Sequence, residues 1–119
     1  MRVLVVEDEV KMAGLLKRAL EEEGYAVDVA GRGEDALWLG TENPYDAIVL
    51  DLMLPEMDGH EVYRRLQEDP LLRAIPVVFL TARALDTTPI APGVRYMTKP
   101  FDVQVLIETV RGSIEGAGA

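Results

Sequence analysis

Short apolar runs alternate along the chain with segments in which apolar residues recur every three or four positions. The runs cover residues 2–6, 25–30, 47–50, 76–80 and 94–97. This alternation is the sequence form of repeated βαβ units, in which helices cover both faces of a parallel sheet. We therefore expect an α/β fold with a doubly wound five-stranded parallel sheet. Right-handed crossovers favour the common strand order 2-1-3-4-5.

Helical spacing predicts helices over residues 10–23, 34–41 and 59–68, and a last helix that begins near Asp102. We expect Gly24 to end the first helix and Asp102 to cap the last one. The residues predicted to face the core from the first helix are Met12, Leu15, Leu16, Ala19 and Leu20. Those predicted to do so from the last helix are Val103, Leu106, Ile107, Val110 and Ile114.

One interval departs from the alternation. A helix is expected between Thr81 and Val94, but Pro89, Pro92 and Gly93 fall within five residues there. Because a helix interior does not tolerate this combination, we expect a loop or a single turn over residues 86–93, with the fourth helix lost or reduced. The last residues, 115–119, have the small-residue composition of a frayed end or a linker stub.

Length and composition narrow the class of protein. The 119 residues fit one domain, which we take to span residues 1–119. The formal charge of -9 disfavours direct nucleic acid binding by this chain. No cysteine is present, which excludes disulfides, thiolate metal sites and cysteine nucleophiles. Because neither a signal peptide nor a long apolar span is visible, we expect a cytoplasmic protein without membrane contact.

Polar side chains follow four of the apolar runs. Glu7 and Asp8 follow the first, Asp51 follows the third, and Thr81 and Lys99 follow the last two. The expected strand order brings the first and third strands together, so three carboxylates share one pocket. Their mutual repulsion is costly unless it is compensated. A bound Mg²⁺, which prefers hard oxygen ligands, would restore neutrality together with Lys99.

Each of these residues also has an ordinary interpretation. Acidic residues such as Glu7 and Asp8 favour the first turn of a helix, where they interact well with the helix dipole. Asp51 could cap a loop, and Thr81 has a β-branched side chain that suits a strand. The joint occurrence of suitable groups at four strand ends is what favours a functional site.

Four stretches of the chain carry a family resemblance. They are residues 3–9, 45–59, 77–83 and 96–101, which read VLVVEDE, YDAIVLDLMLPEMDG, VVFLTAR and YMTKPF. On these stretches the chain resembles the receiver domain of two-component response regulators, the CheY-like superfamily, over nearly its whole length. The resemblance implies a flavodoxin-like fold and a phosphoryl-accepting signalling switch of a phosphorelay.

The resemblance also implies residue roles. Asp51 would accept the phosphoryl group from a sensor histidine kinase, a phosphotransfer protein or a small phosphodonor. Glu7, Asp8, Asp51 and the main-chain carbonyl of Met53 would hold Mg²⁺. Lys99 would pair first with Asp51 and then with the phosphoryl oxygens. The domain would catalyse only its own phosphorylation and dephosphorylation, so it would not be an enzyme in the usual sense.

Further implied roles concern how the signal is sensed. Thr81 would hydrogen-bond the phosphoryl group, and the main-chain N–H groups of Met53 and Ala82 would complete its cradle. Tyr96 aligns with the switch aromatic of the family, and the bond between Lys99 and Pro100 would be cis. A homodimer or an effector domain would contact the region around residues 82–96 and the last helix.

Alternatives to this interpretation stay open at the level of sequence. Val94 and Arg95 replace an acidic pair that is common in dimeric members of the resembled family, which argues against their symmetric dimer. The altered segment before them favours a degenerate receiver, an interaction module that works without phosphorylation, whereas the retention of all five pocket residues disfavours it. A magnesium-dependent hydrolase is a third hypothesis. It is disfavoured because Leu52 and Met53 follow Asp51 where a second carboxylate would be needed, and no P-loop glycine motif is present.

Overall fold

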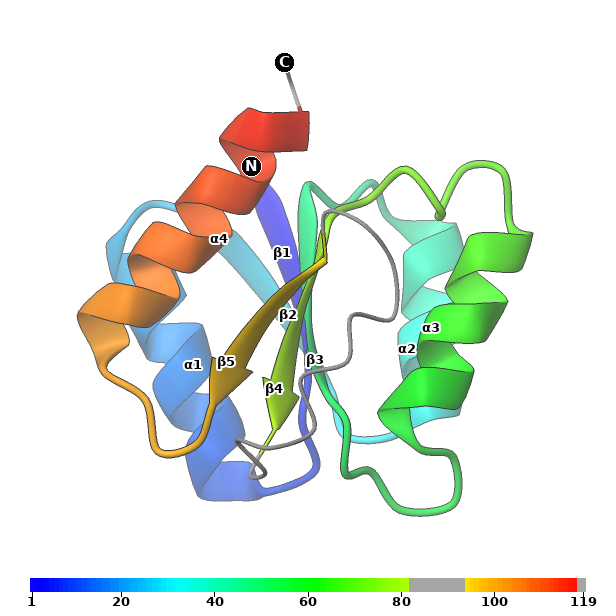
Figure 1. Ribbon diagram of the computed structural model, residues 1–119, viewed down its shortest axis with the longest axis horizontal. Coiled ribbons are helices and arrows are strands. Elements are labelled where there is room, and N and C mark those ends of the chain that lie inside the picture. The colour runs from blue at the N-terminus through cyan, green and yellow to red at the C-terminus, as the bar shows by residue number, and fades with distance from the viewer. Residues whose placement is uncertain (82–93, 118–119) are drawn as a thin grey trace.

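A five-stranded parallel sheet with helices on both faces forms the protein, and its strand order is β2-β1-β3-β4-β5. The computed structural model describes residues 1–81 and 94–117 (Figure 1). In chain order the described elements are β1 (Arg2–Val6), α1 (Val10–Glu22), β2 (Ala26–Ala30), α2 (Gly33–Glu42), β3 (Ala47–Asp51), α3 (Gly59–Glu68), β4 (Val77–Thr81), β5 (Arg95–Thr98) and α4 (Val103–Ala117). The predicted fold class and strand order are therefore confirmed.

The central strands are buried because helices cover both of their faces. All five residues of β3 and all five of β4 are buried, as expected for the interior of a doubly wound sheet. Figure 1 shows α1 and α4 on one face and α2 and α3 on the other. Successive residues of a strand point to opposite faces of the sheet. Leu50 and Phe79 therefore pack with α2 and α3, whereas Val49 and Leu80 pack with α1 and α4.

Helix α1 buries a narrower stripe than its sequence suggests. Leu16, Ala19 and Leu20 are buried as predicted, but Leu15 is 46% exposed, so its predicted core position is wrong. A helix turns about 100° per residue, which places Leu15 on the flank of a stripe centred on Leu16 and Leu20. Ala13 lies on the inner side instead. Gly24 ends the helix region with φ of 94°, a left-handed conformation that favours glycine.

Helix α4 begins as predicted. The Asp102 carboxylate accepts a hydrogen bond of 2.7 Å from the N–H of Gln104, which is N-cap geometry. Val103 is 37% exposed, so its predicted core position is wrong. Side chains on a helix point back toward its N-terminus, and Val103 in the first turn has no preceding turn to pack over. The helix extends to Ala117, into the segment for which we expected a frayed end or linker.

Two sequence predictions concern residues outside the described ranges. The loop or turn expected over residues 86–93 in place of a fourth helix is one of them, and the last two residues of the chain are the other. Within the described ranges, none of the helices combines the length and the apolar character that a bilayer span requires.

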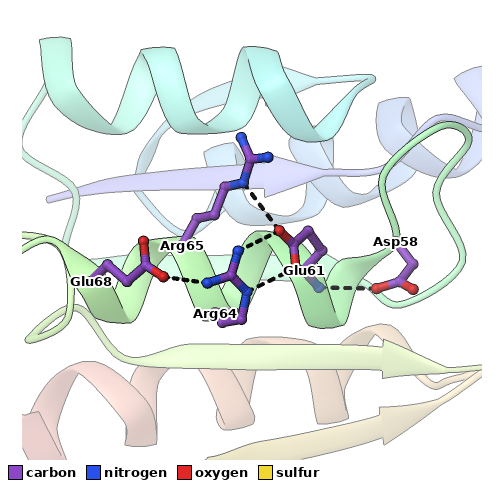
Figure 2. Close-up of polar contacts among 5 residues, drawn as sticks. All are labelled: Asp58, Glu61, Arg64, Arg65 and Glu68. Carbon is purple, nitrogen blue, oxygen red and sulfur yellow. Dashed lines mark hydrogen bonds and ion pairs between the residues drawn. The ribbon is translucent and has the colours of Figure 1, made fainter.

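Helix α3 carries a ladder of ion pairs on its exposed face (Figure 2). Asp58 caps the helix by accepting a 2.9 Å hydrogen bond from the N–H of Glu61. Glu61 in turn pairs with Arg64 and Arg65, and Arg64 also pairs with Glu68. The hydrogen bonds from Arg64 and Arg65 lower the pKa of Glu61 to about 2. Such exposed pairs add little stability each, and it is the Asp58 cap that marks the start of α3, directly after the loop that follows β3.

At the β2 edge of the sheet, a polar triad joins β1, β2 and the turn before β3. The Asp28 carboxylate accepts hydrogen bonds of 2.7 Å from both the Tyr45 hydroxyl and the Arg2 guanidinium. The hydrogen bond from Tyr45 is the main cause that lowers the pKa of Asp28, and Arg2 adds to it against the effect of burial. The ionised form of Asp28 therefore stabilises this edge of the sheet.

Replacement of Asp28 by Asn tests this contribution. We expect the free energy of unfolding at neutral pH to fall by about 1 kcal/mol, because a neutral amide is a weaker acceptor than a carboxylate. A carboxyl group whose pKa falls on folding stabilises the protein above its unfolded pKa and ceases to do so as pH drops through the folded pKa. The difference between the two proteins should therefore persist above pH 3.8 and close below it. Urea unfolding at a series of pH values measures it, and a difference independent of pH would contradict the assignment.

Candidate functional site

The sequence-predicted polar residues meet at one edge of the sheet. Because the strands are parallel, their C-terminal ends lie together, at the lower edge in Figure 1. Glu7 and Asp8 follow β1, while Asp51 and Thr81 are the last residues of β3 and β4. These strands are neighbours in the sheet, with Asp51 in register with Leu80. The predicted convergence of the carboxylates at adjoining strand ends is therefore what the fold produces.

Lys99 reaches the carboxylates from the end of β5. Its ammonium donates hydrogen bonds to Glu7 Oε1 at 2.8 Å and to Asp51 Oδ2 at 3.2 Å. Both carboxylate residues are buried, with only 2% of Glu7 and 3% of Asp51 exposed. The main-chain N–H of Lys99 donates to the carbonyl of Thr81 at 2.8 Å, which anchors the lysine to β4. The bond from Lys99 to Pro100 is cis, as the resemblance implied.

The electrostatics of this cluster are unbalanced toward negative charge. Burial is the main cause that raises the pKa of Glu7 to about 8, and the adjacent Asp51 carboxylate adds to the rise while Lys99 opposes it. Burial acts to lower the pKa of Lys99, but hydrogen bonds to Glu7 and Asp51 outweigh it, and the pKa is raised. Lys99 therefore keeps its charge at neutral pH, and the raised pKa of Glu7 reflects how little positive charge the pocket offers to its buried carboxylates.

The cluster fits a hard divalent cation such as Mg²⁺. Glu7, Asp8 and Asp51 each offer a carboxylate oxygen, and these oxygens lie within 4.8 Å of one another. Among the described residues, Glu7 Oε2 is buried and has no hydrogen-bond partner. A buried polar atom without a partner is costly, and a cation coordinated by oxygen atoms would relieve this cost and the excess negative charge together.

The loop of residues 52–58, which joins β3 to α3, brings main-chain groups to Asp51. The N–H of Met53 donates a 2.9 Å hydrogen bond to Asp51 Oδ1. At the far end of the loop, the N–H of Gly59 donates to the carbonyl of Leu52 at 3.1 Å. Asp51 Oδ1 is thus held by the main chain of this loop, whereas Oδ2 accepts from Lys99.

Gly59 supports the site in a way that the sequence reasoning missed. A Cβ atom at this position would lie 2.5 Å from the carbonyl oxygen of Asp51 and 2.7 Å from the Cα of Leu52. Only glycine allows the start of α3 to approach the end of β3 so closely. The sequence did carry one sign of this close approach. Glycine is a poor helix former, yet Gly59 stands in the first turn of a predicted helix, directly after an N-cap aspartate.

The residues with predicted sensing roles lie on β4 and β5. Thr81 is buried, with 4% exposed, at the end of β4. Tyr96 on β5 is half-buried, and its ring stacks on Phe79 with centroids 5.5 Å apart. Ala82, predicted to contribute a main-chain N–H, lies outside the described residues.

Comparisons with known proteins agree on one family. Residues 3–111 match the family model of the response regulator receiver domain. The transcriptional regulatory protein TcrA of Mycobacterium tuberculosis is 46% identical over 114 residues, which cover 92% of this chain and 44% of that protein. ResD of Bacillus subtilis is 37% identical over 120 residues, or 98% of this chain and 49% of that protein. The chain thus spans about half the length of these curated relatives.

Solved structures give the same result. The receiver domain of the Francisella response regulator 1452 superposes with a TM-score of 0.85 at 36% identity, with 97% of each chain covered. The receiver domain of the sensor histidine kinase PA1611 of Pseudomonas aeruginosa has a TM-score of 0.87 at 29% identity, with 96% of this chain and 97% of that chain covered. That structure holds a magnesium ion coordinated in its active-site cleft.

Replacement of Gly59 by Ala tests the close approach at the start of α3. We expect a loss of about 1–3 kcal/mol in the free energy of unfolding, because the new methyl group overlaps main-chain atoms that cannot move aside easily. Gly14 offers a matched control, since it lies within α1 and a Cβ there meets nothing within 4 Å. Gly14→Ala should stabilise the protein by about 0.5–1 kcal/mol. Equal effects of the two changes in urea unfolding would argue against the overlap.

Replacement of Glu7 by Gln tests the electrostatic imbalance. A carboxyl group whose pKa rises on folding from 4.5 to about 8 binds more protons in the native state, so it destabilises the protein as pH rises through that window. In a chelator-containing buffer, the wild-type protein should lose stability relative to Glu7→Gln by up to about 1.4 kcal/mol per pH unit, the limit for one proton. Parallel stability curves for the two proteins would show that Glu7 does not titrate in this way.

Proposed function

Because the chain belongs to the response regulator receiver domain family, we propose that it is a phosphoryl-accepting switch of a two-component phosphorelay with Asp51 as the acceptor. The observation that carries this proposal is the position of the Lys99 ammonium between Glu7 and Asp51, at 2.8 and 3.2 Å, beside three clustered carboxylates. A nucleophilic carboxylate, a fixed cation and ligands for a metal ion are the groups that phosphoryl transfer needs.

In the proposed reaction, an oxygen of Asp51 attacks the phosphorus atom of a phosphohistidine or a small phosphodonor. A phosphorus–oxygen bond forms and the bond to the leaving group breaks with its electron pair, so acetyl phosphate releases acetate, and phosphohistidine releases an imidazole that takes any proton it needs from solvent. Lys99 turns from the Asp51 carboxylate to the transferred oxygens, whose negative charge it offsets. The N–H of Met53, already bonded to Asp51 Oδ1, holds the carboxylate in position.

Mg²⁺ would be held by Glu7, Asp8, Asp51 and the main-chain carbonyl of Met53, and when bound it neutralises charge on the phosphoryl oxygens. The donor set supports this assignment because it consists of hard oxygen atoms and includes the unpartnered, buried Oε2 of Glu7. The negative charge that the single lysine leaves uncompensated also favours a divalent cation at this site.

The switch that we propose uses Thr81 and Tyr96. Thr81 would donate a hydrogen bond to the phosphoryl group, and the N–H of Ala82 would complete the cradle. Tyr96 lies in register with Phe79 on the neighbouring strand and stacks on it. A movement of Thr81 at the end of β4 would therefore be close enough to affect the packing of Tyr96 on Phe79. Two states that differ by a few kcal/mol can be biased by such new contacts.

The proposed partners follow from the phosphorelay. A sensor histidine kinase or a phosphotransfer protein would supply the phosphoryl group, and an effector domain or a second copy would receive the signal around residues 82–96 and α4. The domain would catalyse only its own phosphorylation and dephosphorylation. Its formal charge of -9 favours protein partners over direct contact with nucleic acid.

Labelling of Asp51 tests the proposed function. With Mg²⁺ and acetyl phosphate, the protein should gain one phosphoryl group at Asp51, detected by intact-protein mass spectrometry and by peptide mapping after borohydride trapping. Asp51→Asn should abolish the labelling because an amide cannot form the acyl phosphate, and a chelator should suppress it.

Asp35→Asn is a matched control for this experiment, since Asp35 is an exposed aspartate in the first turn of α2. It should be labelled as the wild-type protein is. Labelling of the Asp51→Asn protein at the wild-type level would overturn the assignment. A partner that binds the phosphorylated and unphosphorylated forms equally would show instead that the domain is an interaction module independent of phosphorylation.

A further inference from the structure

The loop of residues 52–58 is held on its outer side by a residue from a different part of the chain. The guanidinium of Arg32, the residue before α2, donates a 3.1 Å hydrogen bond to the carboxylate of Glu56. The inner side of the same loop is held by the bonds from Met53 to Asp51 and from Gly59 to Leu52. The Arg32–Glu56 pair is therefore a polar contact between the loop and the start of α2, beside the apolar packing of Leu54 and Met57 on the core.

The backbone at Glu56 makes this side chain an unusual choice. Glu56 has φ of 66°, in the left-handed region, and among the described residues it is the only one other than glycine with a positive φ. Glycine adopts this conformation most readily, and a residue with a Cβ atom does so at a cost. A glutamate at this position is understandable if its carboxylate contributes something that glycine cannot, and that carboxylate forms the ion pair with Arg32.

The surroundings of the pair show a close fit between α2 and the loop. A Cβ atom at Gly33 would lie 3.1 Å from Met57 Sδ and 2.7 Å from Val62 Cγ2. The start of α2 thus packs directly on the end of the loop and on the first turns of α3. Arg32 extends over this contact to Glu56, so a shift of the loop relative to α2 would break the pair.

We propose that Arg32 and Glu56 form a clasp that positions the loop of residues 52–58, and through it the main chain of Met53 beside Asp51, for metal binding and phosphoryl acceptance. Neither residue touches the reacting groups, so both are positioning residues. This inference rests on the proposed function. It adds that a polar pair on the surface, outside the carboxylate cluster, sets how well the cluster binds its cation.

The test compares Mg²⁺ affinity, measured by calorimetry, in the wild-type protein and in variants of the clasp. Arg32→Ala and Glu56→Ala should each weaken Mg²⁺ binding by about two- to fivefold, the factor that corresponds to loss of a solvent-exposed ion pair. The charge-swapped double variant Arg32→Glu with Glu56→Arg should recover most of the loss. Amide hydrogen exchange of residues 53–57 in the metal-free protein should be faster in both single variants by a similar factor.

Two further variants separate positioning from stability. Glu34 lies 3.6 Å from Arg32 and is about as exposed as Glu56, but it belongs to α2, and within the described part of the chain no hydrogen bond or ion pair joins it to the loop. Glu34→Ala is therefore a matched control and should leave Mg²⁺ affinity unchanged. Glu56→Gly removes the pair and also relieves the left-handed backbone. It should raise the unfolding midpoint while it weakens Mg²⁺ binding, a split that a merely structural role would not produce.

The outcomes distinguish this inference from the proposed function. If the wild-type protein is labelled at Asp51 but Arg32→Ala and Glu56→Ala bind Mg²⁺ with wild-type affinity, the clasp is wrong and the proposed function stands. If the wild-type protein is not labelled, the proposed function fails, and amide exchange of residues 53–57 still decides whether the clasp holds the loop. Equal losses of Mg²⁺ affinity in Glu34→Ala and Glu56→Ala would also overturn the proposed clasp.

Discussion

The ion pair of Lys99 with Glu7 and Asp51 is the interaction on which the site depends. Two carboxylates that are almost completely buried would be very costly without a paired cation. One lysine meets this need only in part, since three carboxylate groups lie together at these strand ends. The pair therefore offsets part of the cost of burying these carboxylates and leaves the pocket short of positive charge, which favours a divalent cation.

The two sides of the pocket differ in how they are built. On the side of Asp51, hydrogen bonds from Met53 and the tight packing of Gly59 fix the main chain before any ligand arrives. On the other side stand Thr81 and Tyr96, on β4 and on the edge strand β5. In the proposed switch, the reacting carboxylate would be held by fixed main chain, and the response would use a strand that has only one neighbour in the sheet.

The sequence was sufficient for the sheet, its strand order and the convergence of the carboxylates with Lys99, because apolar runs and the residues that end them are local features. The sequence was less reliable for residues at the border of a buried helix face. Leu15 was predicted to be buried and is 46% exposed, because apolar spacing alone does not show where the buried face ends. The contact of Arg32 with Glu56 could not be predicted, because it depends on how segments distant in sequence meet and no local pattern records that. Gly59 did leave a local signal, a glycine directly after an N-cap aspartate, but its close approach to Asp51 is a property of the folded loop.

The separation in sequence of Lys99 and Glu7 has a consequence for biogenesis. The two residues lie 92 positions apart, one after the first strand and the other after the last, so their contact closes nearly the longest loop that the chain contains. Contacts of this span come late, because the entropy of closing the loop must be met by structure that already exists. A chain still emerging from the ribosome, or one that has lost its edge strand, therefore has no complete pocket. Competence to receive a signal becomes a property of the finished molecule alone.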